Sequence, residues 1–359
     1  MIYDSPLWFM NIDIVAEGLG ELDELAGKSV LISGATGLIC SAVVDIFIRY
    51  NETHETPIGI IAAGRQPQKM IERFGNYYNK DYFYFLRYDA SKNNTKIEVK
   101  ADYIIHGASN ASPKAIVSEP VETMLSNFCG LYFLLNYAKN CGSKKLLYIS
   151  SSEIYGIKSD KKSYKEDDYG YIDFLNPRNS YSVGKCAAET LCASFFSEYG
   201  IEPVIVRPGH IYGPTALPND DRIASTFAYA AARGEKLVMK SEGSQLRSYC
   251  HCLDCAAAII KVLIKGKPAQ AYNIAQPDSF VTVKQMAEFI AKAGNVELVA
   301  NTAVNSEKKN FNPMNNSTLN AKKLTDLGWE SRIEIDKGVK DTIEILKASI
   351  NSSEKESGK

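Results

Sequence analysis

The sequence predicts an α/β protein: a Rossmann-type, doubly wound parallel sheet followed by a smaller C-terminal α/β lobe. Short apolar runs typical of strands alternate with longer helical stretches as far as residue 206. The first apolar run leads directly into a glycine-bearing turn and then into a helical stretch. After Arg207 and Pro208 the regular alternation ends, which indicates the start of the second lobe.

The composition is that of an ordinary globular protein. The chain has 359 residues, of which 45% are hydrophobic and 23% charged, and its net charge is −1. A chain of this length can bury a large core. The near-neutral charge and the lack of a basic run argue against a nucleic-acid partner. Eight cysteines are too few for a disulfide scaffold in a chain this long.

Residues 1–26 precede the first predicted strand and form an N-terminal extension. Its apolar patch, residues 7–10, is too short to span a bilayer, and no cationic region precedes it. We expect this extension to pack on the body of a cytoplasmic protein that has no membrane partner.

The strands and helices of the first lobe are predicted from residue 27 to residue 206. Strands are expected at residues 28–33, 58–63, 82–88, 103–106, 145–150 and 202–206, and helices at 41–50, 121–140 and 183–199. Residues 247–275 are expected to return to this domain, through a strand around Tyr249 and a helix over 255–265. Residues 207–345 mainly form the second lobe, and the polar residues 351–359 are expected to be disordered.

A run of metal-type ligands lies at Cys250, His251, Cys252 and Cys255. Zinc sites usually draw four ligands from two separated clusters, and the sequence has no second cluster of this kind. The sequence therefore predicts no metal site.

The turn from Gly34 to Cys40 has the setting of a dinucleotide-binding turn, because it follows a strand and precedes a helix. Gly34 would permit the tight turn, and Gly37 would let a pyrophosphate approach the helix N-terminus. Cys40 stands at the third glycine position and is small. The candidate cofactor-binding residues of this turn are Gly34, Thr36, Gly37, Leu38 and Ile39.

The cofactor form depends on the end of the second strand. An acid there would bind the ribose 2′-hydroxyl of NAD, whereas an arginine suits the 2′-phosphate of NADP. Residues 61–66 contain Arg65 and no acid, which favours NADP.

Tyr181 and Lys185 are four residues apart, so on a helix they share one face. The ammonium would lower the pKa of the phenol, so that tyrosinate can take a proton from a sugar or alcohol hydroxyl. This spacing is common by chance. The catalytic interpretation is supported by the serine cluster at residues 150–152, about 30 residues upstream, and by the glycine turn.

Taken in order, these motifs resemble the extended short-chain dehydrogenase/reductases, in particular the nucleotide-sugar epimerase, dehydratase and decarboxylase group. The resemblance covers about residues 27 to 345. It rests on the Gly34 turn, Asp89-Ala90, residues 106–109, 150–156, Tyr181/Lys185, 207–214, 243–247, 272–275 and 327–329.

The resemblance implies a nicotinamide cofactor, NAD or NADP, that is tightly held and recycled. It also implies a nucleoside-diphosphate sugar between the lobes, oxidised first at C4. Tyr181 would remove the C4 hydroxyl proton, Ser151 would share a hydrogen bond with that oxygen, and Lys185 would hold the cofactor ribose. Further implied cofactor contacts are Asp89, Ala90, Gly107, Ala108, Ser109, Pro208 and His210. Redox-neutral relatives mostly use NAD, whereas Arg65 favours NADP, so the choice between the two cofactors stays open.

Glu153 lies two residues after Ser151, at the end of a predicted strand, and is expected to point into the same site. It could act as an acid or base at C5 or C6 of the sugar. The alternative is that Glu153 caps a loop or pairs with a surface lysine.

Residues 151–156 resemble the Thr-Ser-Glu-Val-Tyr-Gly box of UDP-glucuronate decarboxylases, and residues 108–113, which include Ser112, resemble a further segment of that group. The decarboxylases carry an arginine where residues 312–317 have Met314. Anion recognition is therefore expected from Arg178, Arg222 or Arg247. We expect Arg247 to bind the diphosphate; the alternative is a salt link between lobes.

The leading prediction is an enzyme that resembles UDP-glucuronate decarboxylases, with a UDP-sugar favoured as substrate. A 4,6-dehydratase and a 4-epimerase stay open, as does a non-catalytic NAD(P)-binding sensor or scaffold. The resemblance also implies a homodimer formed by the helices at 121–140 and 183–199, and polysaccharide biosynthesis as the usual setting.

Overall fold

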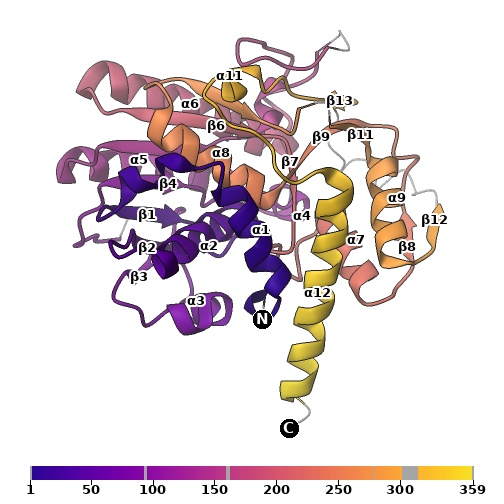
Figure 1. The fold of residues 1–359 in the computed structure, drawn as a ribbon. Helices are drawn as coiled ribbons and strands as arrows, with labels where there is room; N and C mark the ends of the chain where they lie inside the picture. Colours follow the sequence, from indigo (N-terminus) through magenta and orange to yellow (C-terminus); the bar gives the residue numbers. More distant parts are fainter. Residues whose placement is uncertain (1, 93–94, 159–161, 278, 301–313, 358–359) are drawn as a thin grey trace.

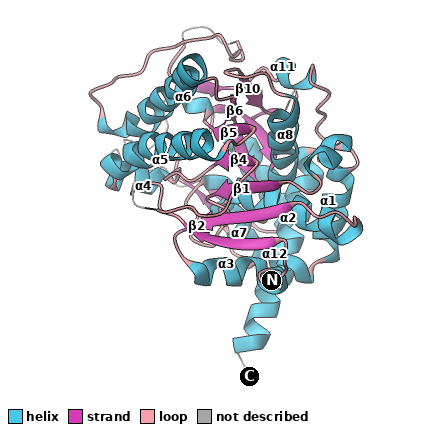
Figure 2. Cartoon of the chain, turned by 90° about the vertical axis from the view of Figure 1, so that its left-hand side faces the viewer, coloured by secondary structure: helices cyan, strands magenta, loops and turns pink. Residues whose placement is uncertain are grey.

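The computed structural model describes residues 2–92, 95–158, 162–277, 279–300 and 314–357. Its main feature is a parallel seven-stranded sheet with the strand order β10-β6-β5-β4-β1-β2-β3 (Figure 2). The strands are β1 (Ser29–Ser33), β2 (Gly59–Gly64), β3 (Phe83–Arg87), β4 (Tyr103–His106), β5 (Lys145–Ile149), β6 (Pro203–Pro208) and β10 (Ala271–Ile274). The predicted doubly wound α/β fold is therefore confirmed, and each predicted strand of the first lobe lies within a few residues of its observed bounds.

Helices cover both faces of this sheet. On one face lie α2 (Leu38–Thr53) and α8 (Cys252–Lys265), and on the other lie α5 (Pro120–Cys141) and α6 (Ser180–Tyr199). Alternate residues of β1 enter the two resulting cores: Val30 and Ile32 pack in one and Leu31 in the other. Because both faces are buried, the central strands β1, β4 and β5 are mostly apolar runs, which is why they could be predicted.

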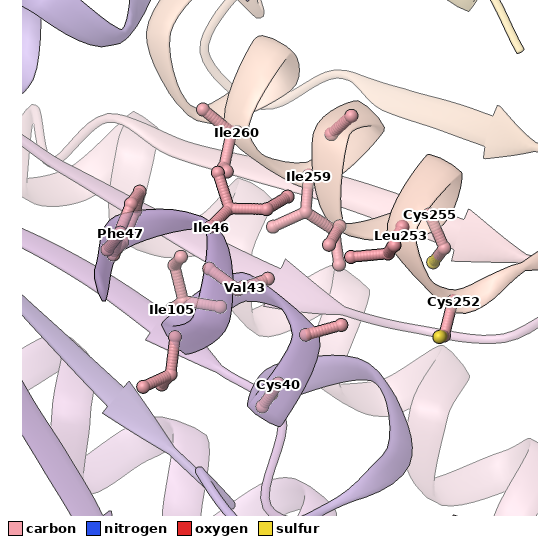
Figure 3. Packing of buried hydrophobic residues seen from close by; sticks show 14 of the residues in the cluster. Cys40, Val43, Ile46, Phe47, Ile105, Cys252, Leu253, Cys255, Ile259 and Ile260 are labelled. Carbon is pink, nitrogen blue, oxygen red and sulfur yellow. The ribbon is translucent and has the colours of Figure 1, made fainter. Parts of the chain in front are cut away.

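The α2–α8 contact forms the centre of the larger core. In Figure 3, Val43 and Ile46 of α2 face Ile259 and Ile260 of α8. Helix α8 begins at Cys252, earlier than the expected residue 255, because a ring nitrogen of His251 accepts a hydrogen bond from the Leu253 amide and caps the helix.

The second lobe is built around β9 (Leu246–His251). This strand pairs with β7 (His210–Tyr212), β11 (Phe280–Thr282) and β13 (Asn316–Ser317). A second small sheet joins β8 (Leu237–Met239) to β12 (Leu298–Ala300), and the lobe's helices are α7 (Ile223–Ala232), α9 (Val283–Gly294) and α12 (Ile335–Ser357) (Figure 1). Of the segment 247–275, only α8 and β10 return to the large sheet, since residues 247–251 belong to β9.

The N-terminal extension consists of η1 (Ile2–Asp4), α1 (Pro6–Ala16) and η2 (Gly20–Leu25). It packs on α2, α8 and α12, and Trp8 and Ile12 of α1 are fully buried. The hydroxyl of Tyr3 donates to Asp45 of α2 over 2.6 Å. Asp45 also pairs with Arg73 of α3 (Pro67–Phe74). The extension thus joins elements of both lobes.

The remaining short elements are η3 (Gly75–Tyr77), α4 (Pro113–Ser118), η4 (Ser152–Tyr155), η5 (Pro177–Asn179) and α11 (Lys322–Thr325). Helix α12 continues through residues 351–357, where composition predicts disorder, so the structure differs there from the expectation; residues 358–359 lie outside the described part. Within the described ranges, no helix has both the length and the apolar character needed to cross a membrane.

Candidate active site

The glycine turn joins β1 to α2 as the sequence predicts. Gly34 adopts φ +73°, and a β-carbon there would lie 3.0 Å from the backbone nitrogen of Ala108. Gly37 is the N-cap of α2, and no side chain caps the helix. The first amides of a 16-residue helix are therefore left for an anionic group, beside the partly exposed Thr36 and Ile39. The neighbouring Leu38 is buried, and its carbonyl accepts from Thr215 over 2.7 Å.

The segment after β4 closes against this turn. The hydroxyl of Ser33 lies 2.7 Å from Nδ1 of His106 and accepts from the amides of Gly107 and Ala108 at 3.2 and 3.3 Å. The hydroxyl of Ser109 is buried and has no hydrogen-bond partner among the described residues. A polar atom in this state is suited to a ligand.

Arg65 and Asp89 stand at the neighbouring ends of β2 and β3. Arg65 is exposed. Partial burial alone would raise the pKa of Asp89, but hydrogen bonds from Ser91 and the charges of Arg65 and Lys92 hold that pKa below its usual value. Both a cation and an ionised acid therefore lie at this edge. Ala90 is buried against Gly130 of α5.

Tyr181 and Lys185 lie in the first turns of α6, and both are buried. The Nζ atom of Lys185 donates to the carbonyl of Ile149 over 2.6 Å and lies 5.6 Å from the centre of the Tyr181 ring. The shared helix face is as predicted, but the expected lowering of the tyrosine pKa is not found. Burial and the charge of Glu153 raise the pKa of Tyr181 to about 12, and burial lowers that of Lys185 to about 7.

Ser151 and Glu153 follow β5, but they do not continue it. The strand ends at Ile149, and residues 152–155 form the 3-10 helix η4, whose N-cap is Ser151. The Ser151 hydroxyl accepts from the Glu153 amide over 3.1 Å. The argument from strand alternation was therefore wrong, although the Glu153 carboxylate still lies close enough to Tyr181 to raise its pKa.

Glu153 is paired with an arginine and not with a surface lysine. Nη1 of Arg178 lies 3.4 Å from Oε2 of Glu153, and the two side chains are only 10% and 21% exposed. Arg178 belongs to η5, immediately before α6, so the segment that carries Tyr181 also carries the partner of Glu153.

The other two predicted arginines differ in how they are neutralised. Arg222 forms a forked contact with Asp220, in which Nε lies 2.9 Å from Oδ1. Arg247 is buried, and Nη1 donates to the carbonyl of Leu246 over 3.0 Å. No carboxylate of the described residues pairs with Arg247, so the alternative of a salt link between lobes finds no support there.

Three other predicted residues have these positions. The hydroxyl of Ser112 accepts from the Ala115 amide over 3.2 Å and caps α4. Pro208 is the last residue of β6, and His210 begins β7. Burial and the charges of Arg247 and Arg222 lower the pKa of His210 to about 3, so its ring is neutral.

Met314 is buried among Ile154, Tyr155, Tyr164, Ala275 and Leu319, while Asn312 and Pro313 lie outside the described residues.

Sequence reasoning missed Tyr249 and Arg207. The Tyr249 hydroxyl is buried without a partner in the described part of the chain, and its ring lies 5.7 Å from that of His210. Since Tyr249 is two residues from Arg247 on β9, strand alternation could have placed the two on one face. Arg207 instead supports the site, through Glu189 of α6 at 2.6 Å and the Tyr155 hydroxyl at 2.9 Å.

These contacts fit a nicotinamide dinucleotide. Three features lie together at the carboxyl ends of parallel strands: an uncapped helix start, a glycine at positive φ, and a Ser109 hydroxyl that has no partner among the residues the structure describes. Tyr181 and Lys185 stand at the end of the same sheet, since Lys185 donates to the last residue of β5.

Comparison with known proteins agrees with this geometry. Residues 30–275 match the family described as the NAD dependent epimerase/dehydratase family. UDP-glucuronic acid decarboxylase 3 of Arabidopsis thaliana is 30% identical over 313 residues, which cover 86% of each chain. A dTDP-D-glucose 4,6-dehydratase of Bos taurus is 26% identical over 351 residues, 93% of each chain.

Solved structures show the same fold. UDP-N-acetylglucosamine 4-epimerase of Methanobrevibacter ruminantium has a TM-score of 0.77 and 21% identity, and the match covers 90% of this chain and 99% of that one. A UDP-glucose 4-epimerase of Thermotoga maritima has a TM-score of 0.75 and 22% identity, with 90% and 99% covered. The chain therefore belongs to the NAD-dependent epimerase/dehydratase family and is an enzyme of that family, as its motifs predicted.

Proposed function

We propose that the protein modifies a nucleoside-diphosphate sugar through a 4-keto intermediate, and that its preferred reaction is the decarboxylation of UDP-glucuronate. The observation that carries this proposal is the convergence of Ser151, Glu153 and Tyr181 beside the partly buried Arg178 and Arg222. The relatives named UDP-glucuronic acid decarboxylase, at 25–30% identity over most of the chain, support the choice of substrate.

The first step is oxidation at C4 of the sugar. The cofactor supplies the hydride acceptor at this step and the hydride donor at the last one. Tyr181 accepts the C4 hydroxyl proton, and the hydroxyl of Ser151 hydrogen-bonds to the same oxygen. Because burial and Glu153 raise the pKa of Tyr181 to about 12, a positive charge near the phenol must offset both effects. Arg222 and Arg178 already lower this pKa, and Lys185, whose Nζ lies 5.6 Å from the centre of the ring, is a further cation beside the phenol.

The second step breaks the bond between C5 and the carboxylate carbon. A carbonyl at C4 makes the sugar a β-keto acid, so the electron pair of that bond moves onto the C4 oxygen as carbon dioxide leaves. Ser151 and Tyr181 donate hydrogen bonds to the developing enolate. A proton from solvent is then added to C5, in place of the carboxylate that left, and Glu153 is the group placed to guide it.

A 4,6-dehydratase is the second candidate. Glu153 favours it, because loss of water across C5 and C6 needs an acid–base group near those carbons, and the 26% identity to a dTDP-D-glucose 4,6-dehydratase supports it as well. In that reaction Glu153 would take the C5 proton and return it to the departing C6 hydroxyl.

We propose NADP as the cofactor form on the strength of Arg65. It is exposed at the end of β2, where a 2′-phosphate would lie, although Asp89 at the neighbouring strand end could instead hold a free ribose hydroxyl. Titration of NAD and NADP into wild-type protein and Arg65→Ala tests this assignment. Preferential loss of NADP affinity supports it, and equal effects on both cofactors contradict it.

We also propose that α5 and α6 form a homodimer interface. The exposed apolar side chains on these helices are Val121, Met124, Leu125, Phe128, Tyr132, Phe196 and Tyr199. An apolar face of this kind usually marks a protein contact. Replacing Phe128 with glutamate should convert a dimer to a monomer in light scattering. A wild-type protein that is monomeric at micromolar concentration would contradict the interface.

The reaction is tested by mass spectrometry of the products. Purified protein is incubated with added NAD or NADP and with UDP-, GDP-, CDP- or dTDP-sugars. Loss of carbon dioxide from UDP-glucuronate supports the decarboxylase, and loss of water from a neutral hexose supports the dehydratase. If no mass changes, separation of isomers tests for 4-epimerisation. No change in any substrate, together with retained cofactor binding, would identify a sensor in place of an enzyme.

A further inference from the structure

Three arginines act on the reacting end of the site, and one of them is already neutralised. Arg178 and Arg222 both lower the pKa of Tyr181, and Arg247 and Arg222 both lower that of His210, so Arg222 acts on both groups while Arg178 and Arg247 each act on one. Arg222 contacts both carboxylate oxygens of Asp220. Its charge and its fork of donors are therefore largely used within the protein.

Arg247 is buried and keeps spare donors. Among the described residues, its hydrogen bond runs from Nη1 to the adjacent carbonyl of Leu246, and burial lowers its pKa. Its neighbours Tyr249 and His210 each carry a buried polar atom without a partner among the described residues. This group lies on β7 and β9 of the second lobe, which suits the diphosphate of the substrate.

Arg178 also keeps spare donors, at a different place. Its side chain is only 10% exposed, and within the described ranges its one ion pair is the 3.4 Å contact from Nη1 to Glu153. Nε is buried and has no hydrogen-bond partner in the described part of the chain. Leaving guanidinium donors buried and unpaired costs free energy unless a ligand accepts from them.

The place of Arg178 suits the sugar more than the diphosphate. It lies three residues before Tyr181 in the chain, it is paired with Glu153, and its charge acts on the phenol that reaches C4. A group at C6 is two carbons from C4. As far as the described residues go, the site thus holds two incompletely paired guanidinium groups, one beside the reacting carbons and one on β9.

We infer that Arg178 determines specificity by binding a carboxylate at C6 of the sugar; the diphosphate is left to Arg247, as already expected from the sequence. This inference rests on the proposed function and names the residue that selects a uronate. Met314 cannot supply that charge, because it is an uncharged side chain buried in an apolar cluster. A guanidinium fork can contact Glu153 through one nitrogen and a substrate carboxylate through the others.

Binding experiments separate carboxylate recognition from a merely structural role of Arg178. All proteins carry Tyr181→Phe to prevent turnover and are saturated with cofactor. Calorimetry measures the affinity for UDP-glucuronate, UDP-glucose and UDP. The protein that carries only Tyr181→Phe, the parent, should bind UDP-glucuronate more tightly than UDP-glucose. Arg178→Gln should reduce that preference about 10- to 100-fold, the effect of a charged hydrogen bond, and should leave UDP binding unchanged. Arg178→Lys should recover part of it.

Arg247→Gln is the matched control, since it removes the other buried guanidinium. It should weaken all three ligands by a similar factor and preserve the preference between the two sugars. The inference is overturned if the parent shows no preference for UDP-glucuronate, or if Arg178→Gln weakens both sugars equally. Failure of every nucleotide sugar and of UDP to bind would instead reject the proposed function, and the inference with it.

Discussion

The Sγ atom of Cys40 occupies the space that a side chain at Gly107 would need. A β-carbon on residue 107 would lie 2.3 Å from that sulfur, and the next contact, with Cδ1 of Ile149, would be 3.1 Å. Cys40 stands in the first turn of α2 and Gly107 directly follows β4. A cysteine at the third glycine position of the turn is therefore accommodated by a glycine on the neighbouring strand.

Gly107→Ala should consequently destabilise the protein, by about 1–3 kcal/mol, and weaken cofactor binding. Cys40→Ala removes the atom that clashes, so the double variant should recover part of both losses. Urea unfolding and cofactor titration of the two single variants and the double variant give the coupling energy. Strictly additive losses would show that the two positions do not compete for the same space.

Tyr181→Phe should reduce turnover by at least two to four orders of magnitude, the usual contribution of a general acid–base group. The cofactor should still bind, because the glycine turn and the Lys185 contact with Ile149 do not use the phenol oxygen. Product formation and cofactor titration are measured on the same preparation. A variant that retains near-normal turnover would remove Tyr181 from the chemistry.

The sequence was sufficient where a residue's place depends on its neighbours in the chain. The central strands are mostly apolar runs, and Tyr181 and Lys185 share a helix face by their spacing. The use of strand alternation to orient Glu153 was wrong. The strand β5 ends at Ile149, and the following residues form the 3-10 helix η4. The predicted lowering of the Tyr181 pKa was also wrong. That pKa depends on the burial of the phenol and on the Glu153 carboxylate, neither of which the spacing of Tyr181 and Lys185 reveals.

Contacts between distant segments could not be predicted from the sequence. The Glu153–Arg178 pair joins residues 25 positions apart across an irregular loop. Residues 247–275 were expected to return to the first domain, with a strand around Tyr249, but that strand, β9, pairs with β7, β11 and β13. Apolar alternation indicates that a segment is a strand, and it does not indicate which strand becomes its neighbour.

Breaking the buried contact between Asp45 and Arg73 should destabilise the fold strongly. The Asp45 side chain is fully buried, and it also accepts from the Tyr3 hydroxyl over 2.6 Å. Asp45→Ala would leave the Arg73 charge uncompensated, at a cost of about 3–5 kcal/mol in the free energy of unfolding. Lys322→Gln breaks an exposed pair with Asp326 and serves as the control, with little change expected. Equal effects of the two substitutions in urea unfolding would contradict this account.

Acidification should destabilise the protein before most carboxylates titrate. Burial lowers the pKa values of His106, His210 and His251 to about 3, and nearby cations add to the effect. The cations are Lys185 beside His106, Arg247 and Arg222 beside His210, and Lys337 beside His251, where Asp341 opposes it.

The sign follows from proton uptake. Above about pH 6.5 these histidines are neutral in both states, and their contribution to stability is fully present. Below that pH the unfolded chain takes up protons that the folded state excludes until the pH approaches 3. The free energy of unfolding should thus fall from pH 6.5 to 5, by on the order of 1 kcal/mol for each of these histidines. His251→Gln should reduce the slope of the free energy of unfolding against pH by the amount that corresponds to about one proton taken up on unfolding. An unchanged slope in that variant would show that His251 does not stay neutral in the folded protein.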